Sequence, residues 1–152
     1  MNHASKTPSF RPHKLALAVA LALGGPSAWA ANFYVGVGAD PGDSDPATLD
    51  CSNSSNGTCT LSAAIRAANQ AGGSNTITLN TDVIVNGVMK RLIDSNITLQ
   101  SNSVTCDFAI CGISGSDTYR PLFIKSGTVT IRNLNLTHGK AHVASKSSCP
   151  VF

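Results

Sequence analysis

The stretch GTCTLSAAIRAANQAGGSNTITL, residues 57–79, contains a cysteine, one helical pattern, a glycine stop and a strand-like segment. Its apolar residues recur at the spacing of one helix face: Leu61, Ala64, Ile65 and Ala68. Thr60 is suited to cap the start of this helix, and the sequence AGG at residues 71–73 ends it. A helix of so few turns is not stable alone in water. We therefore expect its apolar face to rest on a β-structure.

Strand-like segments follow this helix at repeating distances. The segment TITLN at residues 76–80 recurs as NITLQ at residues 96–100, and VTC at residues 104–106 recurs as VTI at residues 129–131. Self-similarity over about 20 to 25 residues is typical of a solenoid. An earlier segment, NFYVGVG at residues 32–38, alternates like a half-buried first strand.

The parity of the apolar positions changes twice, as it would where a strand path turns a corner. The changes separate residues 97–99 from 104–110, and 129–131 from 134–136. We therefore predict an all-β fold, a short parallel β-helix (solenoid) with a short N-terminal capping α-helix. Cys59 would fix the entry to this helix, which would cover the open first turn. The alternative is an antiparallel sandwich, whose strands would recur every 8 to 12 residues or so.

The first 30 residues have the features of a secretory signal peptide. Basic residues precede the apolar run LALAVALAL, and helix breakers and the small-residue sequence AWA follow it. A membrane-spanning helix needs about 20 apolar residues, so we expect cleavage after Ala30 rather than an anchor. The mature chain is expected to be exported to the periplasm, the outer-membrane surface or the medium, with no transmembrane segment.

Removal of this leader leaves a chain without net charge. Residues 31–152 contain four Lys and four Arg against eight Asp, with no Glu. The basic residues are scattered along the chain, which argues against binding to nucleic acids or anionic lipid. Abundant Asn, Ser, Thr and Gly favour strands and turns.

The mature chain has five cysteines, for which disulfides are the expected state in an oxidising compartment. Two pairs are close in sequence, Cys51 with Cys59 and Cys106 with Cys111, whereas Cys149 has no neighbour. Spacing alone does not decide the connectivity. No CxxC pair occurs, which argues against a zinc site.

The acidic residues form neither a recognisable calcium loop nor an active-site pattern. Those of the loop at residues 39–58 lack the spacing of an EF-hand, and solvated turns are the preferred interpretation: Asp40, Asp43, Asp45 and Asp50. The strand-region acids share no repeat position: Asp82, Asp94, Asp107 and Asp117. Polysaccharide cleavage needs clustered carboxylates, so we expect no enzyme activity, cofactor or metal. His138 and His142 are interpreted as parts of a surface turn.

The helical stretch also resembles the CSLREA domain, a short region near the start of exported bacterial proteins with right-handed parallel β-helix repeats. Six residues stand at matching positions: Cys59, Leu61, Ala64, Ile65, Ala68 and Asn69. Thr60 replaces the Ser of the motif, whereas Ser62 and Ala63 stand where the motif has Arg and Glu. Without that Glu the capping box is incomplete. We expect a helix start weaker by about 0.5 to 1 kcal/mol.

The resemblance covers residues 32–141, and LFIKSGTVTIRNLNLTHGKA at residues 122–141 looks like one rung of such a repeat. The expected order is a signal peptide at 1–30, a capping region at 31–75, β-helix rungs at 76–141 and an irregular tail at 142–152. Because the tail shows neither alternation nor a cap, we expect an N-terminal fragment of a longer protein. A small stand-alone secreted protein is the alternative.

The resemblance implies a non-enzymatic surface or secreted protein, adhesin-like or of the autotransporter-passenger type, rather than one defined activity. The expected partners are host glycans or surface proteins, met by ladders of Asn, Ser and Thr, and the downstream rungs of a longer chain. Asn133 and Asn135 are candidate contact residues. The alternative is a fragment of a secreted polysaccharide-active β-helix enzyme, which would need acidic residues from further rungs.

Overall fold

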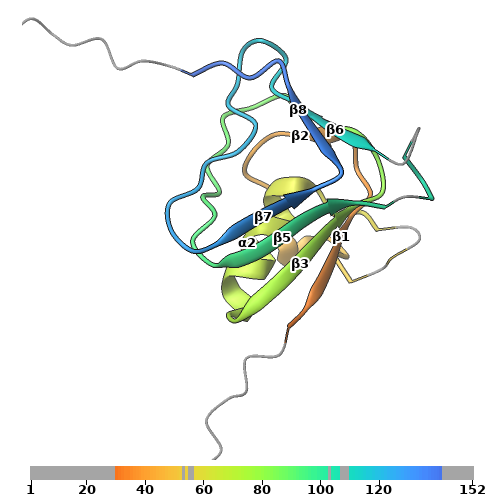
Figure 1. Ribbon diagram of the computed structural model, residues 1–152, viewed down its shortest axis with the longest axis vertical. Helices are drawn as coiled ribbons and strands as arrows, with labels where there is room; N and C mark the ends of the chain where they lie inside the picture. The colour runs from red at the N-terminus through yellow and green to blue at the C-terminus, as the bar shows by residue number, and fades with distance from the viewer. Residues whose placement is uncertain (1–29, 53, 55–56, 103, 107–109, 142–152) are drawn as a thin grey trace, which may run out of the picture.

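A computed structural model of the protein describes residues 30–52, 54, 57–102, 104–106 and 110–141. In this part of the chain, short strands alternate between two four-stranded sheets (Figure 1). The first sheet contains, in order, β1 (Asn32–Val35), β3 (Ser74–Leu79), β5 (Asn96–Ser101) and β7 (Val129–Arg132). The second contains β2 (Ala39–Asp40), β4 (Val83–Val85), β6 (Cys111–Ser114) and β8 (Leu134–Thr137). The predicted leader and tail fall mostly or wholly outside the described residues.

All neighbouring strands in both sheets pair in parallel. The register aligns aliphatic side chains in two columns: Ile77, Leu99 and Ile131 in the first sheet, and Val83, Ile113 and Leu136 in the second. Alternate residues of a strand point to opposite faces. The first two members of each column are buried, and they form the core between the sheets.

The pairing register differs from the echo in the sequence. Matching TITLN to NITLQ places Ile77 beside Ile97, but Ile77 pairs with Leu99 and Asn75 pairs with Ile97. A shift of two positions leaves the same side chains on the same face, so the alternation still indicates the buried face. The second echo does not correspond to paired strands, because Val104 lies in a turn and is 88% exposed.

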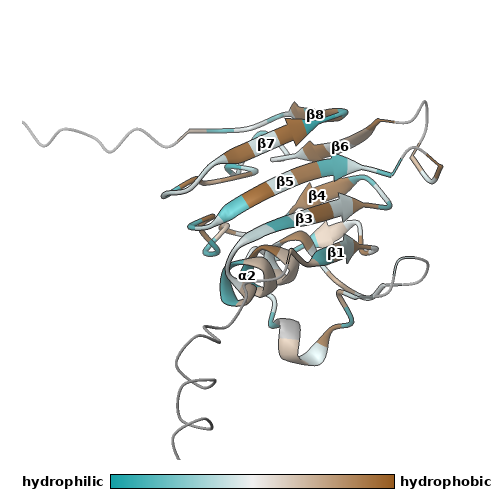
Figure 2. Ribbon diagram, turned by 60° about the horizontal axis from the view of Figure 1, so that its bottom comes forward, coloured by the Kyte–Doolittle hydropathy of each residue, from teal (hydrophilic) through white to brown (hydrophobic). Residues whose placement is uncertain are grey.

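The helix α2 (Leu61–Ala71) lies at one end of the two sheets, beside β1 and β3. Figure 2 shows the strands stacked away from α2, with β7 and β8 at the far end. The predicted apolar stripe is fully buried: Leu61, Ala64, Ile65 and Ala68. The helix ends at Gly72, whose φ of 67° is readily adopted by glycine. A short 3₁₀ helix, η1 (Pro46–Thr48), contacts α2.

The prediction of an all-β fold, a right-handed parallel β-helix with a capping helix, is wrong. The structure has two parallel four-stranded sheets and one helix, an α/β-like arrangement, and not a closed solenoid. Irregular segments at residues 86–95 and 115–128 connect one layer to the next. In the described part of the chain these segments are paired only through the isolated bridge between Ile93 and Ile124. The helix also supplies a large share of the buried core.

Candidate functional site

The N-terminus of α2 is held by its own cap and by a residue from a distant strand. The Thr60 hydroxyl accepts a hydrogen bond from the Ala63 amide at 3.3 Å, as the sequence predicts. The Ser62 amide donates to Oδ2 of Asp40 at 2.5 Å, and the Ser62 hydroxyl donates to Oδ1 at 2.7 Å. The amide of Gly42 donates to the same Oδ1 at 2.7 Å. A carboxylate at a helix N-terminus is favoured by the helix dipole as well as by these bonds.

Asp40 therefore helps to hold the start of α2, through the Ser62 amide rather than the Thr60 amide that a capping-box Glu would bind. It is fully buried in β2, whereas the sequence suggested a solvated turn. Sequence reasoning missed this residue because the contact joins positions 22 residues apart. The expected weakness of the helix start rested on the missing Glu alone, and it did not include the contribution of Asp40.

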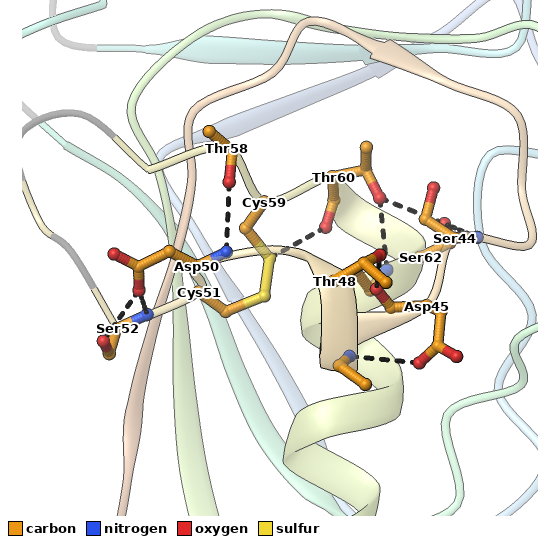
Figure 3. The surroundings of a disulfide bond; sticks show 12 residues. Ser44, Asp45, Thr48, Asp50, Cys51, Ser52, Thr58, Cys59, Thr60 and Ser62 are labelled. Carbon is orange, nitrogen blue, oxygen red and sulfur yellow. Dashed lines mark hydrogen bonds between the residues drawn. A yellow bond between two sulfur atoms is a disulfide. The ribbon is translucent and has the colours of Figure 1, made fainter.

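A disulfide loop covers the outer edge of β1. The structure pairs Cys51 with Cys59, one of the two close pairs suggested by the sequence. The carbonyl of Cys51 accepts from the Tyr34 amide at 2.8 Å, and that of Cys59 accepts from the Gly36 amide at 3.1 Å. Figure 3 shows this disulfide beside Thr60 and the start of α2. The unpaired edge that a first strand would otherwise present is thus partly satisfied.

Two asparagine side chains connect α2 to the neighbouring segments by hydrogen bonds. Asn69, a position of the CSLREA resemblance, donates to the Leu92 carbonyl at 2.7 Å and accepts from the Ser95 hydroxyl at 2.8 Å. Asn75, at 1% exposure, donates to the carbonyls of Ala68 and Gly72 at 2.8 and 2.9 Å. The helix is therefore tied both to the connection before β5 and to β3.

The second suggested pair, Cys106 with Cys111, is also joined in the structure. It lies in the connection between β5 and β6. Cys111 is fully buried at the start of β6, and Cys106 packs partly against the core. Cys149 and His142 lie outside the described residues.

Two further acidic residues of the early loop, Asp43 and Asp45, form ion pairs. Asp43 contacts Nζ of Lys90 at 3.1 Å and Nη2 of Arg91 at 2.6 Å. Asp45 contacts Nη1 of Arg66 at 3.1 Å. The hydrogen bond from Lys90, together with the charges of Arg91, Lys90 and Arg66, lowers the pKa of Asp43 below 3.8. Among the described residues, no group of three or more His, Cys, Asp or Glu side chains is placed to hold a metal ion.

The outer face of the first sheet carries a column of threonines. Thr76 pairs with Thr98, and Thr98 pairs with Thr130, so adjacent members lie about 4.8 Å apart. Around them is a hollow of about 320 Å³, which is also lined by Ser74, Asn75, Asn96, Ile97 and Thr128. We name this surface the threonine face. No charged side chain lines it in the described part of the chain, and its hydroxyl and amide groups suit a neutral, hydroxyl-rich ligand.

The two candidate asparagines lie elsewhere. Asn133 forms the corner between β7 and β8 with a φ of 49°, in the left-handed region that Asn tolerates. Asn135 lies in β8 and lines a separate hollow of about 460 Å³ with Asp82, Gly112, Thr137 and His138. His138 is an exposed turn residue with a φ of 50°. The structure therefore does not bring Asn133 and Asn135 to the threonine face.

Comparison with protein-family models, with curated proteins and with solved structures gives no match to this chain. Within the described ranges, none of the helices has the length and apolar character that crossing a membrane requires.

Proposed function

We propose that this chain is a non-enzymatic, N-terminal part of an exported bacterial surface or secreted protein, adhesin-like or passenger-like. In this proposal α2 closes the start of the two sheets, and the threonine face contacts neutral glycans of a host surface. The leader-like residues 1–30 and the CSLREA resemblance of residues 59–69 support export of such a protein. The two disulfides are compatible with an oxidising compartment.

The observation that carries the proposal is the threonine face. Thr76, Thr98 and Thr130 lie in one column of paired strands, and the core-facing neighbours Ile77 and Leu99 of the first two are fully buried. Within the described part of the chain, no protein group is hydrogen-bonded to their hydroxyls, which are therefore available to a ligand. A fixed array of uncharged donors and acceptors favours a repeating hydroxylated chain over an ion.

We also propose that further parallel strands add to β7 and β8. Ile131 and Leu136 occupy core-facing columns but are 41% and 44% exposed. In the described part of the chain, the outer edges of β7 and β8 have no strand partner. An unpaired strand edge presents free N–H and C=O groups that can pair with a further strand. Such strands would come from a downstream region of a longer chain.

Export is tested by fusing alkaline phosphatase, which is active only after export, behind the full chain and behind residues 31–152. We expect activity only when residues 1–30 are present. Equal activity of the two fusions would contradict the leader assignment.

Glycan contact is tested on an array of neutral and acidic glycans with the exported, disulfide-bonded protein. The Thr98→Val, Thr130→Val double variant removes two hydroxyls while retaining branched side chains, and it should weaken binding by about tenfold. The matched control is Thr105→Val, at an exposed turn outside the hollow. Binding that the double variant leaves unchanged, or the absence of binding to any neutral glycan, would refute the threonine face as a contact surface.

A further inference from the structure

A second hollow lies on the side of the molecule formed by the irregular connections. Its volume is about 270 Å³, and its apolar wall consists of Val88, Met89, Tyr119 and Phe123. Thr118, Arg120 and Lys140 complete its lining. Val88 is 66% exposed and Phe123 is 38% exposed. These two side chains contribute little to the core, and as exposed apolar groups around a hollow they suggest a binding surface.

Backbone hydrogen bonds hold the wall in place. The Lys140 amide donates to the Tyr119 carbonyl at 3.0 Å, and the Ile93 amide donates to the Phe123 carbonyl at 2.9 Å. On the other side, Gly42 and Val88 are in such close contact that a Cβ on Gly42 would lie 2.3 Å from the Val88 carbonyl oxygen. A ligand would therefore find the hollow already formed, which lowers the entropy cost of binding.

The charges around the hollow are of one sign. Arg120 lies over the Phe123 ring at 5.0 Å from its centroid, and Lys140 is exposed at the rim. Across the described ranges, neither of these side chains has a carboxylate partner, whereas Arg66, Lys90 and Arg91 are all paired. No acidic residue lines the hollow. Two available cations beside an apolar wall fit a ligand with an anionic head and an apolar body.

We propose that this hollow binds a small carboxylic acid with a single-ring or short branched apolar body. The carboxylate is recognised by the Arg120 guanidinium and the Lys140 ammonium, and Arg is suited to two parallel hydrogen bonds with a carboxylate. The apolar body packs against Met89, Tyr119 and Phe123. The volume limits the ligand to about one ring, because pockets for drug-sized molecules start near 300 Å³. This site is separate from the threonine face and does not depend on the glycan proposal.

The probe is phenylacetate, titrated into the exported full chain by calorimetry and by NMR. Phenylacetamide has the same body without the charge and should bind about tenfold more weakly or not at all. Galacturonate carries a carboxylate on a polar ring and should also bind more weakly. Equal affinity for the acid and the amide would overturn the role of the cations. Affinity for galacturonate that matches or exceeds that for phenylacetate would overturn the role of the apolar wall.

Variants of the two cationic residues assign the site. Arg120→Gln and Lys140→Gln should each lower phenylacetate affinity by about tenfold, whereas Arg120→Lys should retain part of it. Lys125→Gln is the matched control, because it removes one positive charge from the same connecting segment but does not line this hollow. Unfolding midpoints of all variants confirm that the fold is intact. No saturable binding, or the same loss in Lys125→Gln as in the two site variants, would refute the proposal.

Discussion

The two ends of the sheet stack have similar sequence patterns but very different surroundings. At one end α2 and the Cys51 to Cys59 loop cover the core and the edge of β1. At the other end β7 and β8 repeat the same alternation, but their core-facing side chains are partly exposed. Ile77 and Ile131 belong to one column of the first sheet, and their exposed fractions are 0% and 41%.

This difference shows that an alternating pattern indicates which way a side chain points and not how deeply it is buried. Ile113 and Leu136 repeat the comparison in the second sheet, at 0% and 44%. A side chain is buried when paired strands lie on both sides of its own strand. Ile77 in β3 has such strands in β1 and β5, whereas Ile131 in β7 has a described neighbour only in β5. The free energy of unfolding of single-residue variants measures how much each of these positions contributes to stability.

The largest expected effect separates Ile77 from Ile131. Ile77→Ala leaves a cavity in a packed core and should lower the free energy of unfolding by about 2 to 5 kcal/mol. Ile131→Ala removes a half-exposed side chain and should cost about 1 kcal/mol or less. Urea unfolding of both variants, with disulfides intact, gives the two values. Equal costs would mean that another segment covers Ile131 in solution.

The next effect concerns how α2 is attached. Asp40→Ala leaves three buried donors, on Ser62 and Gly42, without their acceptor. We expect a loss of about 3 kcal/mol in the free energy of unfolding, in line with the cost of orphaned buried groups. Asp94→Ala is the control, because Asp94 is exposed and should change stability by no more than about 0.5 kcal/mol. Similar midpoints for the two variants would show that the buried carboxylate does not hold the helix.

The local features of the capped end could be predicted from the sequence. The helix was expected over residues 61–68, and the observed Leu61–Ala71 buries every residue of its apolar stripe. Thr60 acts as the cap and Gly72 ends the helix, because both roles are set by neighbouring residues. The short separations of the two close cysteine pairs suggested their pairing without deciding it, and the structure joins both pairs.

What depends on distant contacts could not be predicted in the same way. Asp40 meets Ser62 only after β2 and α2 have docked, and β2 has two residues, too few to show an alternation. The register of β3 and β5 follows core packing, with Asn75 beside Ile97, and not the best match of letters. The closed solenoid failed for a related reason, because periodicity does not reveal whether the connecting segments pair into a third sheet. The threonine face could be found only after the register was known.

The smallest expected effect on stability concerns Asp43, which lies three positions after the buried Asp40 of β2. Asp43 is exposed, and its hydrogen bond from Lys90 and the charge of Arg91 hold its pKa below 3.8. A lowered carboxyl pKa in the folded state adds stability at pH values above the unfolded pKa, and this stability is lost as the pH falls through the folded pKa. Asp43→Asn should therefore lower the urea midpoint slightly at neutral pH and leave it unchanged well below pH 3.8.

High salt should reduce the difference between Asp43→Asn and the unsubstituted protein at neutral pH, because exposed ion pairs are screened. A difference that persists at low pH would show that the Asp43 side chain acts through packing, as a buried residue does, and would remove the contrast between the two carboxylates.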